Sequence, residues 1–396
     1  MFKNVPSAPR DAILGLTEAF RSDPRPEKIN LSVGVYQDES GQTPVLEVVR
    51  EAEQKMAVES ASKGYLPISG LPAYAEKVQK LLFGEEYEGL QDGRATTFQT
   101  PGGTGALRVA ADFLHAQLPQ ATVWLSDPTW ANHPNIFAAA GVATKTYPYY
   151  DSTTHGLSIE RMLSAIKTIP AGDVILLHAC CHNPTGIDPD PSQWQAIATA
   201  VGKQGLLPLV DFAYQGFAEG VEEDATSLRR FCQDELMVCN SFSKNFGLYR
   251  ERVGALSVVS NTSENSQAVE SQIKRTIRTN YSNPPFHGAE IVNRVLQDEV
   301  WRTRWEQELG QMRQRIGDMR QLLVEKLIEC GVQGDYSFIT RQRGMFSYTG
   351  LTTAQVDLLR EQHAVYIVGS GRINVAGINS ANVNRLADAI GKVVGT

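Results

Sequence analysis

Five short apolar runs between residues 121 and 260 constrain the fold of this chain more than any other feature of its sequence. The runs are ATVWLS (121–126), DVILLHACC (173–181), LLPLVD (206–211), LMVCNSFS (236–243) and GALSVVS (254–260). Each is unbroken rather than alternating, which is typical of strands covered on both faces in a mostly parallel sheet. Helical patterns such as PSQWQAIATAVGKQG lie between several runs. This order predicts an α/β fold with right-handed βαβ crossovers.

The regions on either side of these runs predict helices and an arm. Residues 1–44 are rich in proline and charge, and their one apolar run, INLSVGVY, predicts a single extended segment. VLEVVREAEQKMAVE (45–59) and ALRVAADFLHAQL, which starts at Ala106, have helical spacing. Apolar residues recur every three or four positions from Arg302 to Cys330 and predict one amphipathic helix, long enough to bridge two domains.

The residues after this helix predict a small α+β domain, because short strand patterns such as GMFSYTG alternate with the helices TAQVDLLREQH and ANVNRLADAIGKVV. The N-terminal residues lack a core of their own, so we expect them to pack on this small domain. The expected organisation is an N-terminal arm and part of the small domain at 1–44, a large domain at 45–310, and a small C-terminal domain at 311–396.

Composition argues against several classes of protein. A formal net charge of −7 disfavours a nucleic-acid binder, and 42% hydrophobic residues disfavour disorder. The five cysteines form no CxxC pair, which favours reduced thiols over disulfides or a zinc site, so we expect no metal. The stretch MFKNVPSAPRDAILGL has no apolar core for a signal peptide, and nothing resembles a membrane span. We expect a cytoplasmic enzyme with no nucleic-acid or membrane partner.

Polar side chains follow three successive apolar runs: Asn183, Asp211 and Lys244. In open α/β sheets, ligands bind beyond the carboxyl ends of the strands, so an amide, a carboxylate and an amine could meet in one crevice. Each residue also has a plainer interpretation: a turn at HNPTG, a helix N-cap at Asp211, and a solvated surface amine at Lys244. However, Lys244 follows a buried strand among Ser and Gly, which favours a partly desolvated amine suited to Schiff-base chemistry.

The segment TPGGTG (100–105) runs directly into a predicted helix. Glycines let the backbone approach a ligand, and the start of a helix presents free N–H groups to an anion. The segment matches neither GxGxxG nor GxxxxGK[ST], so it predicts a phosphate seat rather than a dinucleotide or P-loop site. Glycine-rich turns are common, and the motif is weak alone. Arg252 and the hydroxyls of Ser241 and Ser243 could complete the seat.

The segment DPTWANH places Trp130 and His133 just after the first apolar run. A tryptophan there belongs either to the core or to a crevice, where it would stack on a flat ring. A lysine amine, a buried carboxylate, a phosphate seat and an aromatic plate together specify pyridoxal phosphate, with the carboxylate paired to the pyridinium nitrogen.

Over nearly its whole length, the chain resembles the class I PLP-dependent aminotransferases of fold type I, in particular the bacterial aspartate and aromatic amino-acid enzymes. The matching motifs are QTPGGTGALRVAADFL, DPTWANH, LLHACCHNPTG, DFAYQGF, NSFSKNFGLYRERVGALS, RTNYSNPP, RGMFSYTGL and SGRINVAG. The resemblance implies a large PLP domain, with a mostly parallel sheet flanked by helices, and a small α+β domain made from both chain ends. It also implies a homodimer with shared active sites.

The resemblance implies a role for each matching residue. Lys244, Asp211 and Tyr214 would be catalytic: Lys244 would bind the cofactor covalently and shuttle a proton, and Asp211, supported by His133, would bind the pyridinium nitrogen. The remaining cofactor contacts would come from Asn183 and Tyr214 at the phenolic oxygen, from Trp130 on the ring, and from Gly103, Thr104, Ser241, Ser243, Arg252 and the other subunit's Tyr65 at the phosphate.

Substrate binding is also implied by the resemblance. Arg372, with Asn183 and the Gly34 backbone, would bind the α-carboxylate beside Trp130, and Arg278 from the other subunit would bind a side-chain carboxylate. The implied reaction is a ping-pong transfer of the amino group of aspartate, and of aromatic amino acids, to 2-oxoglutarate.

Other functions remain as alternatives. RTNYSNPP and GGTGA resemble the aspartate branch, whereas GYLPISG and DPTWANH resemble the aromatic branch, so a mainly tyrosine and phenylalanine aminotransferase is the first alternative. Another PLP reaction, such as decarboxylation, is disfavoured by two arginines that would hold carboxylates in place. A regulator with a PLP domain is disfavoured because no N-terminal helix-turn-helix region is evident.

Overall fold

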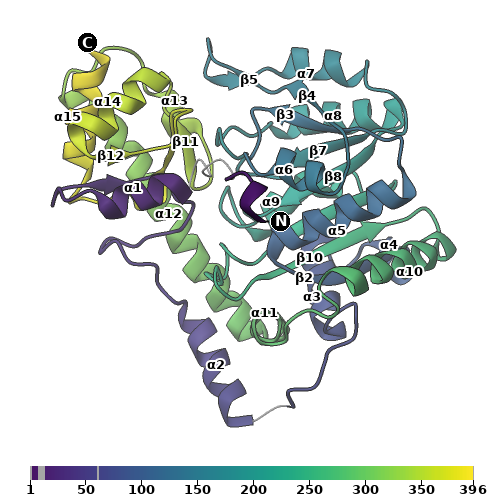
Figure 1. Cartoon of the computed structure of the whole chain (residues 1–396). Coiled ribbons are helices and arrows are strands. Elements are labelled where there is room, and N and C mark those ends of the chain that lie inside the picture. Colours follow the sequence, from purple (N-terminus) through teal and green to yellow (C-terminus); the bar gives the residue numbers. More distant parts are fainter. Residues whose placement is uncertain (1, 8–13, 60–61, 396) are drawn as a thin grey trace. The chain divides into compact units, whose positions relative to one another are not determined.

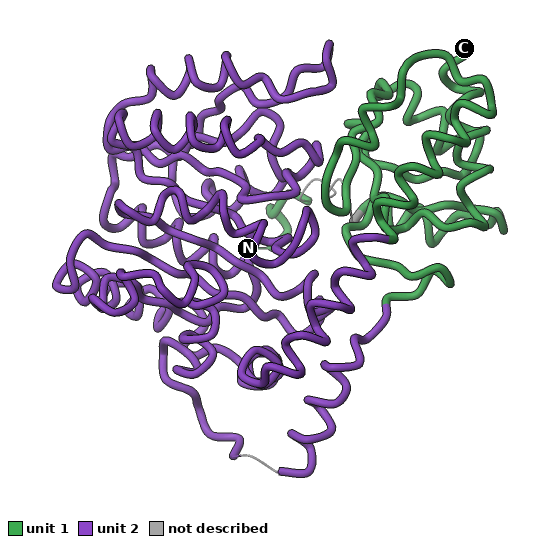
Figure 2. The backbone as a smooth tube through the Cα atoms, turned by 180° about the vertical axis from the view of Figure 1, so that it is seen from behind, with its two compact units in different colours: residues 1–43, 315–396 green, residues 44–314 purple. Residues whose placement is uncertain are grey.

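The computed structural model describes residues 2–7, 14–59 and 62–395, so Met1 and residues 8–13 of the expected N-terminal arm lie outside the described residues. The chain divides into two compact units, one of residues 1–43 and 315–396 and the other of residues 44–314 (Figure 2). The later of the two divisions between these units falls between Gln314 and Arg315, whereas residue 310 was expected. Both positions lie inside one continuous helix, α12 (Glu299–Glu329).

The unit of residues 44–314 is built on a seven-stranded sheet with the order β2-β10-β9-β8-β7-β3-β4 (Figure 1). Its strands are β2 (Ala95–Pro101), β3 (Val123–Asp127), β4 (Thr144–Pro148), β7 (Val174–His178), β8 (Leu207–Phe212), β9 (Leu236–Ser241) and β10 (Val253–Val259). The sheet is mostly parallel, as predicted, but β10 runs antiparallel to both of its neighbours, β2 and β9. Because β10 runs in the opposite direction, its first residues lie at the edge where β2 and β9 end.

All five predicted apolar runs form strands, whereas two strands of this sheet escaped prediction. Strand β2 has the polar sequence ATTFQTP, yet five of its seven residues are buried. One of its hydroxyl groups bonds across the sheet, between Thr97 Oγ1 and Ser257 Oγ at 2.8 Å, and Thr100 Oγ1 donates to the Gly102 carbonyl at 3.1 Å. Strand β4 is at the edge of the sheet and largely exposed. Apolar patterning therefore gave no signal for either strand.

Helices cover this sheet. They are α2 (Glu47–Glu59), α3 (Pro72–Phe83), α4 (Glu88–Gln91), α5 (Gly102–Gln117), α6 (His133–Ala139), α7 (Ile159–Ile166), α8 (Pro191–Gln204), α9 (Val221–Arg229), α10 (Ser263–Asn280), α11 (His287–Gln297) and the first half of α12. Helix α5 packs along β2, β8, β9 and β10 and also contacts α6 and α10. Buried side chains such as Leu107, Leu125 and Ile273 join these elements into one core. A small hairpin, β5 (Tyr150–Asp151) with β6 (Gly156–Leu157), completes the unit.

The unit of residues 1–43 and 315–396 combines both ends of the chain. Its elements are η1 (Phe2–Asn4), α1 (Leu14–Ser22), β1 (Ile29–Asn30), the second half of α12, α13 (Phe338–Arg341), β11 (Phe346–Tyr348), α14 (Thr353–His363), β12 (Val365–Tyr366), β13 (Arg372–Asn374), η2 (Val375–Gly377) and α15 (Val383–Val394). Strand β1 pairs parallel to β12, and β11 pairs antiparallel to β13. The first pairing attaches the N-terminal segment to the C-terminal residues.

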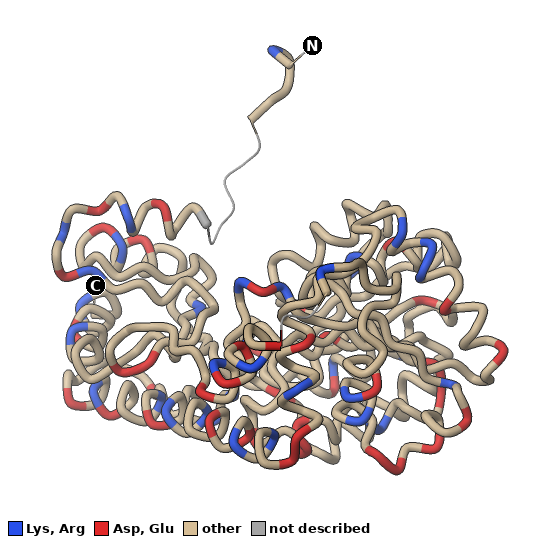
Figure 3. The backbone as a smooth tube through the Cα atoms, turned by 90° about the horizontal axis from the view of Figure 1, so that it is seen from below, with Lys and Arg blue, Asp and Glu red and all other residues tan. Residues whose placement is uncertain are grey.

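Charged residues of both signs are interspersed in each unit (Figure 3). Several form ion pairs one helical turn apart, such as Arg302 with Glu306 at 3.1 Å. Within the described part of the chain, no helix has the combination of length and apolar character that crossing a bilayer requires.

Candidate active site

The candidate site lies at the carboxyl edge of the sheet in the unit of residues 44–314. His178 ends β7 and is paired in register with Asp211 near the end of β8, and Asp211 is paired in turn with Cys239 of β9. Strand β9 ends at Ser241, from which the chain reaches Lys244 in three residues. Parallel pairing thus brings together side chains that are far apart in the sequence.

Lys244 presents a partly buried amine beside an aromatic ring. Its Nζ lies 4.9 Å from the ring centroid of Tyr214, a side chain that is itself buried. Burial lowers the pKa of the Lys244 amine below its ordinary value, the charge of Arg252 lowers it further, and the carboxylate of Asp211 opposes both effects. The amine is therefore closer to its neutral, nucleophilic form than a surface lysine would be.

Asp211 is a buried carboxylate held by a histidine. Its Oδ2 lies 3.0 Å from Nε2 of His133, which opens α6 and has no exposed surface. Burial by itself would raise the pKa of Asp211, but the hydrogen bond from His133 and the charge of Lys244 hold it below its ordinary value. The carboxylate therefore stays ionised and can hold a proton on a basic ligand atom.

A chain of hydrogen bonds extends from Asp211 through two histidines. His133 Nδ1 lies 2.8 Å from Thr129 Oγ1, which lies 3.4 Å from His178 Nε2. The backbone N–H of Asn183 donates to His178 Nδ1 at 3.3 Å. Burial lowers the pKa of His178 to about 3, so this ring is neutral at pH 7.

One backbone amide sets the direction of this chain. An N–H group can only donate, so His178 Nδ1 must accept and its proton resides on Nε2. Thr129 Oγ1 then accepts from His178 Nε2. An ionised carboxylate can only accept, so His133 Nε2 carries a proton and donates it to Asp211.

The glycine-rich segment forms an anion seat beside Ser241. Gly103 and Thr104 begin α5, whose N-cap, Pro101, makes no side-chain capping bond. A Cβ at Gly102, whose φ is +75°, would lie 2.5 Å from Arg252 Nη2, and one at Gly103 would lie 3.1 Å from Ser241 Cβ. Glycine at these positions therefore lets Arg252 and Ser241 approach the first turn of α5, whose free backbone amides can bind an anion.

The sheet register explains why these groups converge. Gly254 of β10 is paired with Thr100 of β2 on one side and with Ser241 of β9 on the other. Arg252 immediately precedes β10 and is exposed, and its Nη1 donates to Ser243 Oγ at 3.4 Å. Backbone amides, hydroxyls and a guanidinium group together are the donors that bind a phosphate group.

Trp130 and Asn183 border the same cluster. Trp130 is partly buried against the core of the unit, and its ring meets the His133 ring edge-on, with centroids 5.2 Å apart. Trp130 therefore lies at the margin of the core, one of its two expected environments, and its stacking on a ring stays a prediction. Asn183 is buried directly after the His178 strand, five residues from the ring that its amide contacts.

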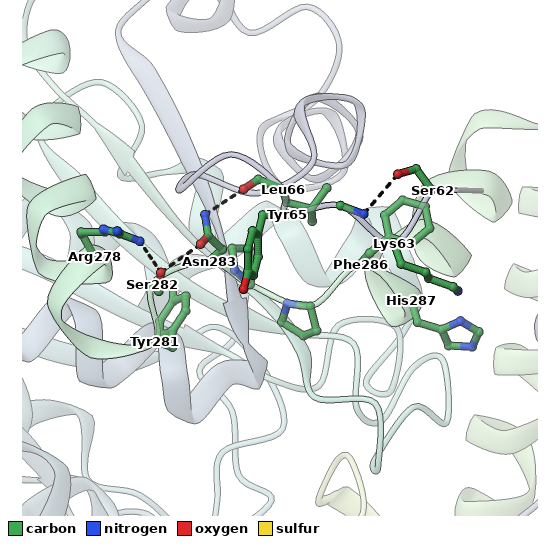
Figure 4. A pocket seen from close by; sticks show the side chains of 13 residues that line it. Ser62, Lys63, Tyr65, Leu66, Arg278, Tyr281, Ser282, Asn283, Phe286 and His287 are labelled. Atoms are coloured by element: carbon green, nitrogen blue, oxygen red, sulfur yellow. Dashed lines mark hydrogen bonds between the residues drawn. The ribbon is translucent and has the colours of Figure 1, made fainter.

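Tyr65 and Arg278 lie together in a different pocket, a cavity of about 890 Å³ (Figure 4). Tyr65 is 96% exposed. Arg278 donates to Ser282 Oγ, Ser282 Oγ donates to Asn283 Oδ1 at 2.9 Å, and Asn283 Nδ2 donates to the Leu66 carbonyl at 2.8 Å. The residues lining this pocket include neither Lys244 nor Asp211.

Arg372 and Gly34 belong to the other unit, where both lie close to one phenylalanine, Phe346. Arg372, on β13, is buried, donates to the Ser32 carbonyl at 2.7 Å, and holds its guanidinium group 4.1 Å from the Phe346 ring centroid. A Cβ at Gly34 would lie 2.7 Å from Cζ of Phe346. Phe346 therefore supports both residues that were expected to meet a substrate carboxylate.

Sequence reasoning missed several members of these clusters. Thr129 and His178 complete the hydrogen-bonded chain to Asp211, and Phe346 lies under Arg372. His178 carried a usable signal, because it ends an apolar run just as Asp211 does. Thr129 and Phe346 carried none, since their importance depends on contacts between distant segments.

Comparison with known proteins agrees with this geometry. Residues 26–390 match the family model described as aminotransferase class I and II. The chain is 53% identical over 392 residues to an aspartate aminotransferase of Salmonella typhi, covering 98% of this chain and 99% of the relative. It is 47% identical over 397 residues to the aromatic-amino-acid aminotransferase of Escherichia coli, covering 100% of both chains.

A solved structure extends the similarity to three dimensions. An aromatic-amino-acid aminotransferase from Burkholderia pseudomallei, covalently bound to pyridoxal phosphate, superposes with a TM-score of 0.97 at 49% identity. The match covers 100% of this chain and 99% of that one.

Proposed function

Since this chain belongs to the class I and II aminotransferase family, we propose that it is a pyridoxal-phosphate-dependent transaminase that moves the amino group of aspartate, and of aromatic amino acids, to 2-oxoglutarate. The names of the Salmonella and Escherichia relatives support both substrate classes. The neighbour covalently bound to pyridoxal phosphate supports the cofactor. Transfer between two amino acid and oxo acid pairs on one site is a ping-pong exchange.

The observation that carries the proposal is the pairing of two groups: the Lys244 amine, whose pKa is lowered by burial, and the buried Asp211 carboxylate, whose charge acts on that amine. An amine with a lowered pKa can attack the cofactor carbonyl and can later accept and return the proton of the substrate Cα. When bound, pyridoxal phosphate supplies the electron sink that accepts negative charge from that carbon. The ionised carboxylate of Asp211 holds the proton on the ring nitrogen that keeps this sink strong.

The groups at the edge of the sheet fit the rest of this cofactor. The anion seat of Gly103, Thr104, Ser241, Ser243 and Arg252 suits its phosphate. Asn183 and Tyr214 are both buried, Tyr214 beside Lys244, and offer an amide and a phenol for the ring's phenolic oxygen, and Trp130 offers an aromatic face for the ring. We assign the binding of the cofactor to the unit of residues 44–314.

Substrate recognition is assigned to two arginines. Arg372 presents a guanidinium group that can bind the α-carboxylate common to all amino acids, with help from Asn183 and the Gly34 backbone. Arg278 is exposed in the pocket with Tyr65 and suits the second carboxylate of aspartate or 2-oxoglutarate. The two roles differ, because aromatic amino acids carry only the first carboxylate.

A shared site between two subunits is part of the proposal. Tyr65 and Arg278 share a pocket whose lining includes neither Lys244 nor Asp211. We assign both to the active site of a second copy of this chain, Tyr65 at the phosphate and Arg278 at the substrate. The enzyme is then a homodimer, and we assign it to the cytoplasm.

The alternative is an enzyme that acts mainly on tyrosine and phenylalanine, supported by the similarity to aromatic-amino-acid aminotransferases. Steady-state kcat/KM for aspartate, tyrosine and phenylalanine, each with 2-oxoglutarate, separates the two. Substantial turnover of aspartate with measurable aromatic turnover supports the proposal. Aspartate turnover at the level of a Lys244→Ala control would contradict it.

A further inference from the structure

A buried carboxylate on α9 holds the chain that carries Tyr214. Asp224 lies near the start of the helix and is 5% exposed. Its two oxygens accept four backbone N–H groups from the preceding loop: those of Gly216 at 2.8 Å, Ala218 at 3.0 Å, Glu219 at 2.9 Å and Gly220 at 3.4 Å. This loop, residues 216–220, begins two residues after Tyr214.

Two further contacts connect the loop to Tyr214. The backbone N–H of Phe217 donates to the Tyr214 carbonyl at 3.0 Å. The thiol of Cys180 lies 3.5 Å from the same carbonyl and 3.6 Å from Asp224 Oδ2. Burial raises the pKa of Cys180, so the thiol keeps its proton and can donate it to either oxygen.

The same helix also holds the chain that carries Asn183. Ser227, almost one turn beyond Asp224, donates its hydroxyl to the Ala179 carbonyl at 2.8 Å. Ala179 and Cys180 follow β7 and lead to Asn183 within a few residues. One face of α9 is therefore attached both to the segment after β7 and to the segment after β8.

We propose that Asp224 is a positioning residue that fixes the phenol of Tyr214 relative to the amide of Asn183, acting through loop 216–220 and the Cys180 thiol. This inference rests on the proposed function, in which these two side chains share the phenolic oxygen of the cofactor. A purely structural Asp224 would stabilise α9 and leave the properties of the bound cofactor unchanged.

An isosteric substitution separates these two roles. Asp224→Asn keeps the shape of the side chain but replaces one acceptor oxygen with an NH₂ donor. That donor would face N–H groups of the loop, so the loop must shift. Asp173→Asn is the matched control, because Asp173 is also buried and accepts the Thr122 N–H and the Trp124 Nε1–H, both at 2.9 Å. It precedes β7, at the opposite end of that strand from Asn183.

The test measures the pH at which the absorbance of the bound cofactor changes in the holoenzyme. When the phenolic oxygen accepts fewer hydrogen bonds, it binds the proton that it shares with the lysine nitrogen more tightly. The apparent pKa of the bound cofactor therefore rises. We expect Tyr214→Phe to raise it by about one unit and Asp224→Asn by at least about 0.3 unit. Asp211 and Arg252, the charged groups acting on Lys244, are unchanged in these variants.

The double variant shows whether the two residues act together. Asp224→Asn should add nothing once Tyr214→Phe is present, because both act on the same hydrogen bond. Asp173→Asn should lower the melting temperature of the apoenzyme and leave the spectroscopic pKa unchanged. A wild-type pKa in Asp224→Asn, or a full additional shift in the double variant, would overturn the proposal.

Two further results keep the test decisive. If Tyr214→Phe itself leaves the pKa unchanged, the assigned role of Tyr214 fails, and this inference fails with it. A shift in Tyr214→Phe but none in Asp224→Asn refutes the positioning role alone. Should Asp224→Asn not fold, Cys180→Ala takes its place, since it removes the thiol between Asp224 and Tyr214; a wild-type pKa there would overturn the proposal.

Discussion

His178 and Asp211 occupy paired positions on neighbouring parallel strands, so the imidazole that ends β7 stands beside the carboxylate near the end of β8. The two are also connected through Thr129 and His133, in a chain whose direction is set by the Asn183 amide. The hydrogen bond from His133 and the charge of Lys244 keep the Asp211 carboxylate ionised.

We expect borohydride reduction of the holoenzyme to attach the cofactor to the peptide that contains Lys244. The partly buried amine with a lowered pKa is the reason. Peptide mapping by mass spectrometry checks the site, with Lys203 of α8 as a surface-lysine control. Lys244→Ala should retain the cofactor without a covalent bond, and label on any other lysine would contradict the assignment.

We expect Asp211→Ala to lower kcat by more than about tenfold, which corresponds to about 1.4 kcal/mol of barrier. Loss of the carboxylate removes the charge that holds the ring-nitrogen proton, whereas the anion seat at Gly103 and Arg252 is left in place. Kinetics and cofactor titration measure the two effects separately. A kcat within tenfold of wild type would show that the electron sink does not depend on this carboxylate.

Stability should fall as the pH drops from about 6.5 toward 3. The pKa of His178 is lowered to about 3 in the folded protein, so the unfolded chain binds this proton first. The contribution of His178 to the free energy of unfolding is therefore fully present above pH 6.5 and is lost on acidification. At pH 5 the free energy of unfolding is lower by about 2 kcal/mol. Urea midpoints at pH 7.5 and 5 measure it.

Matched substitutions identify the histidine responsible. His178→Gln should reduce the difference between the two urea midpoints, because it removes the buried proton-binding group. His115→Gln, at an exposed position on α5, should leave the difference as in the wild type. Equal differences in all three proteins would rule out His178 as a source of the acid sensitivity.

Mixing two inactive variants should restore activity if the active sites are shared. Lys244→Ala and Arg278→Ala disable different parts of the site, and in a mixed dimer one site has both groups intact. We expect aspartate activity above that of either parent after subunit exchange, which native mass spectrometry can verify. Exchange without recovery would argue that Arg278 serves the site of its own chain.

The two arginines should differ in substrate dependence. Truncating one partner of a buried charge pair costs about 2–5 kcal/mol, roughly 30-fold to several thousand-fold in kcat/KM. Arg278→Ala should impose this loss on aspartate and a much smaller one on phenylalanine, which lacks a second carboxylate. Arg372→Ala should impair both substrates. The measurement is kcat/KM for both substrates in both variants, and equal losses in Arg278→Ala would exclude the two-arginine model.

The sequence by itself determined much of this protein. Unbroken apolar runs identified β3, β7, β8, β9 and β10, since burial on both faces leaves a local pattern. The repeat of apolar residues identified α12, and Asp211 and Lys244 were recognisable because reactive side chains lie at or shortly after the ends of buried apolar runs. These signals are local, so a single sequence can carry them.

The tertiary structure decided the rest, because it depends on pairing between distant segments. The antiparallel insertion of β10 between β2 and β9 brings Thr100, Gly254 and Ser241 into one register and places Arg252 at the anion seat. Strand β2 is polar and gives no apolar signal, and its buried Thr97 and Thr100 hydroxyls bond to Ser257 of β10 and to the Gly102 carbonyl. In the sequence, Asp224 likewise cannot be distinguished from other acidic residues at the start of a helix. Its role depends on the loop that folds against it. Hydrogen bonds between residues that are distant in the sequence leave no periodic pattern along the chain. The contacts that organise this site are hydrogen bonds of this long-range type.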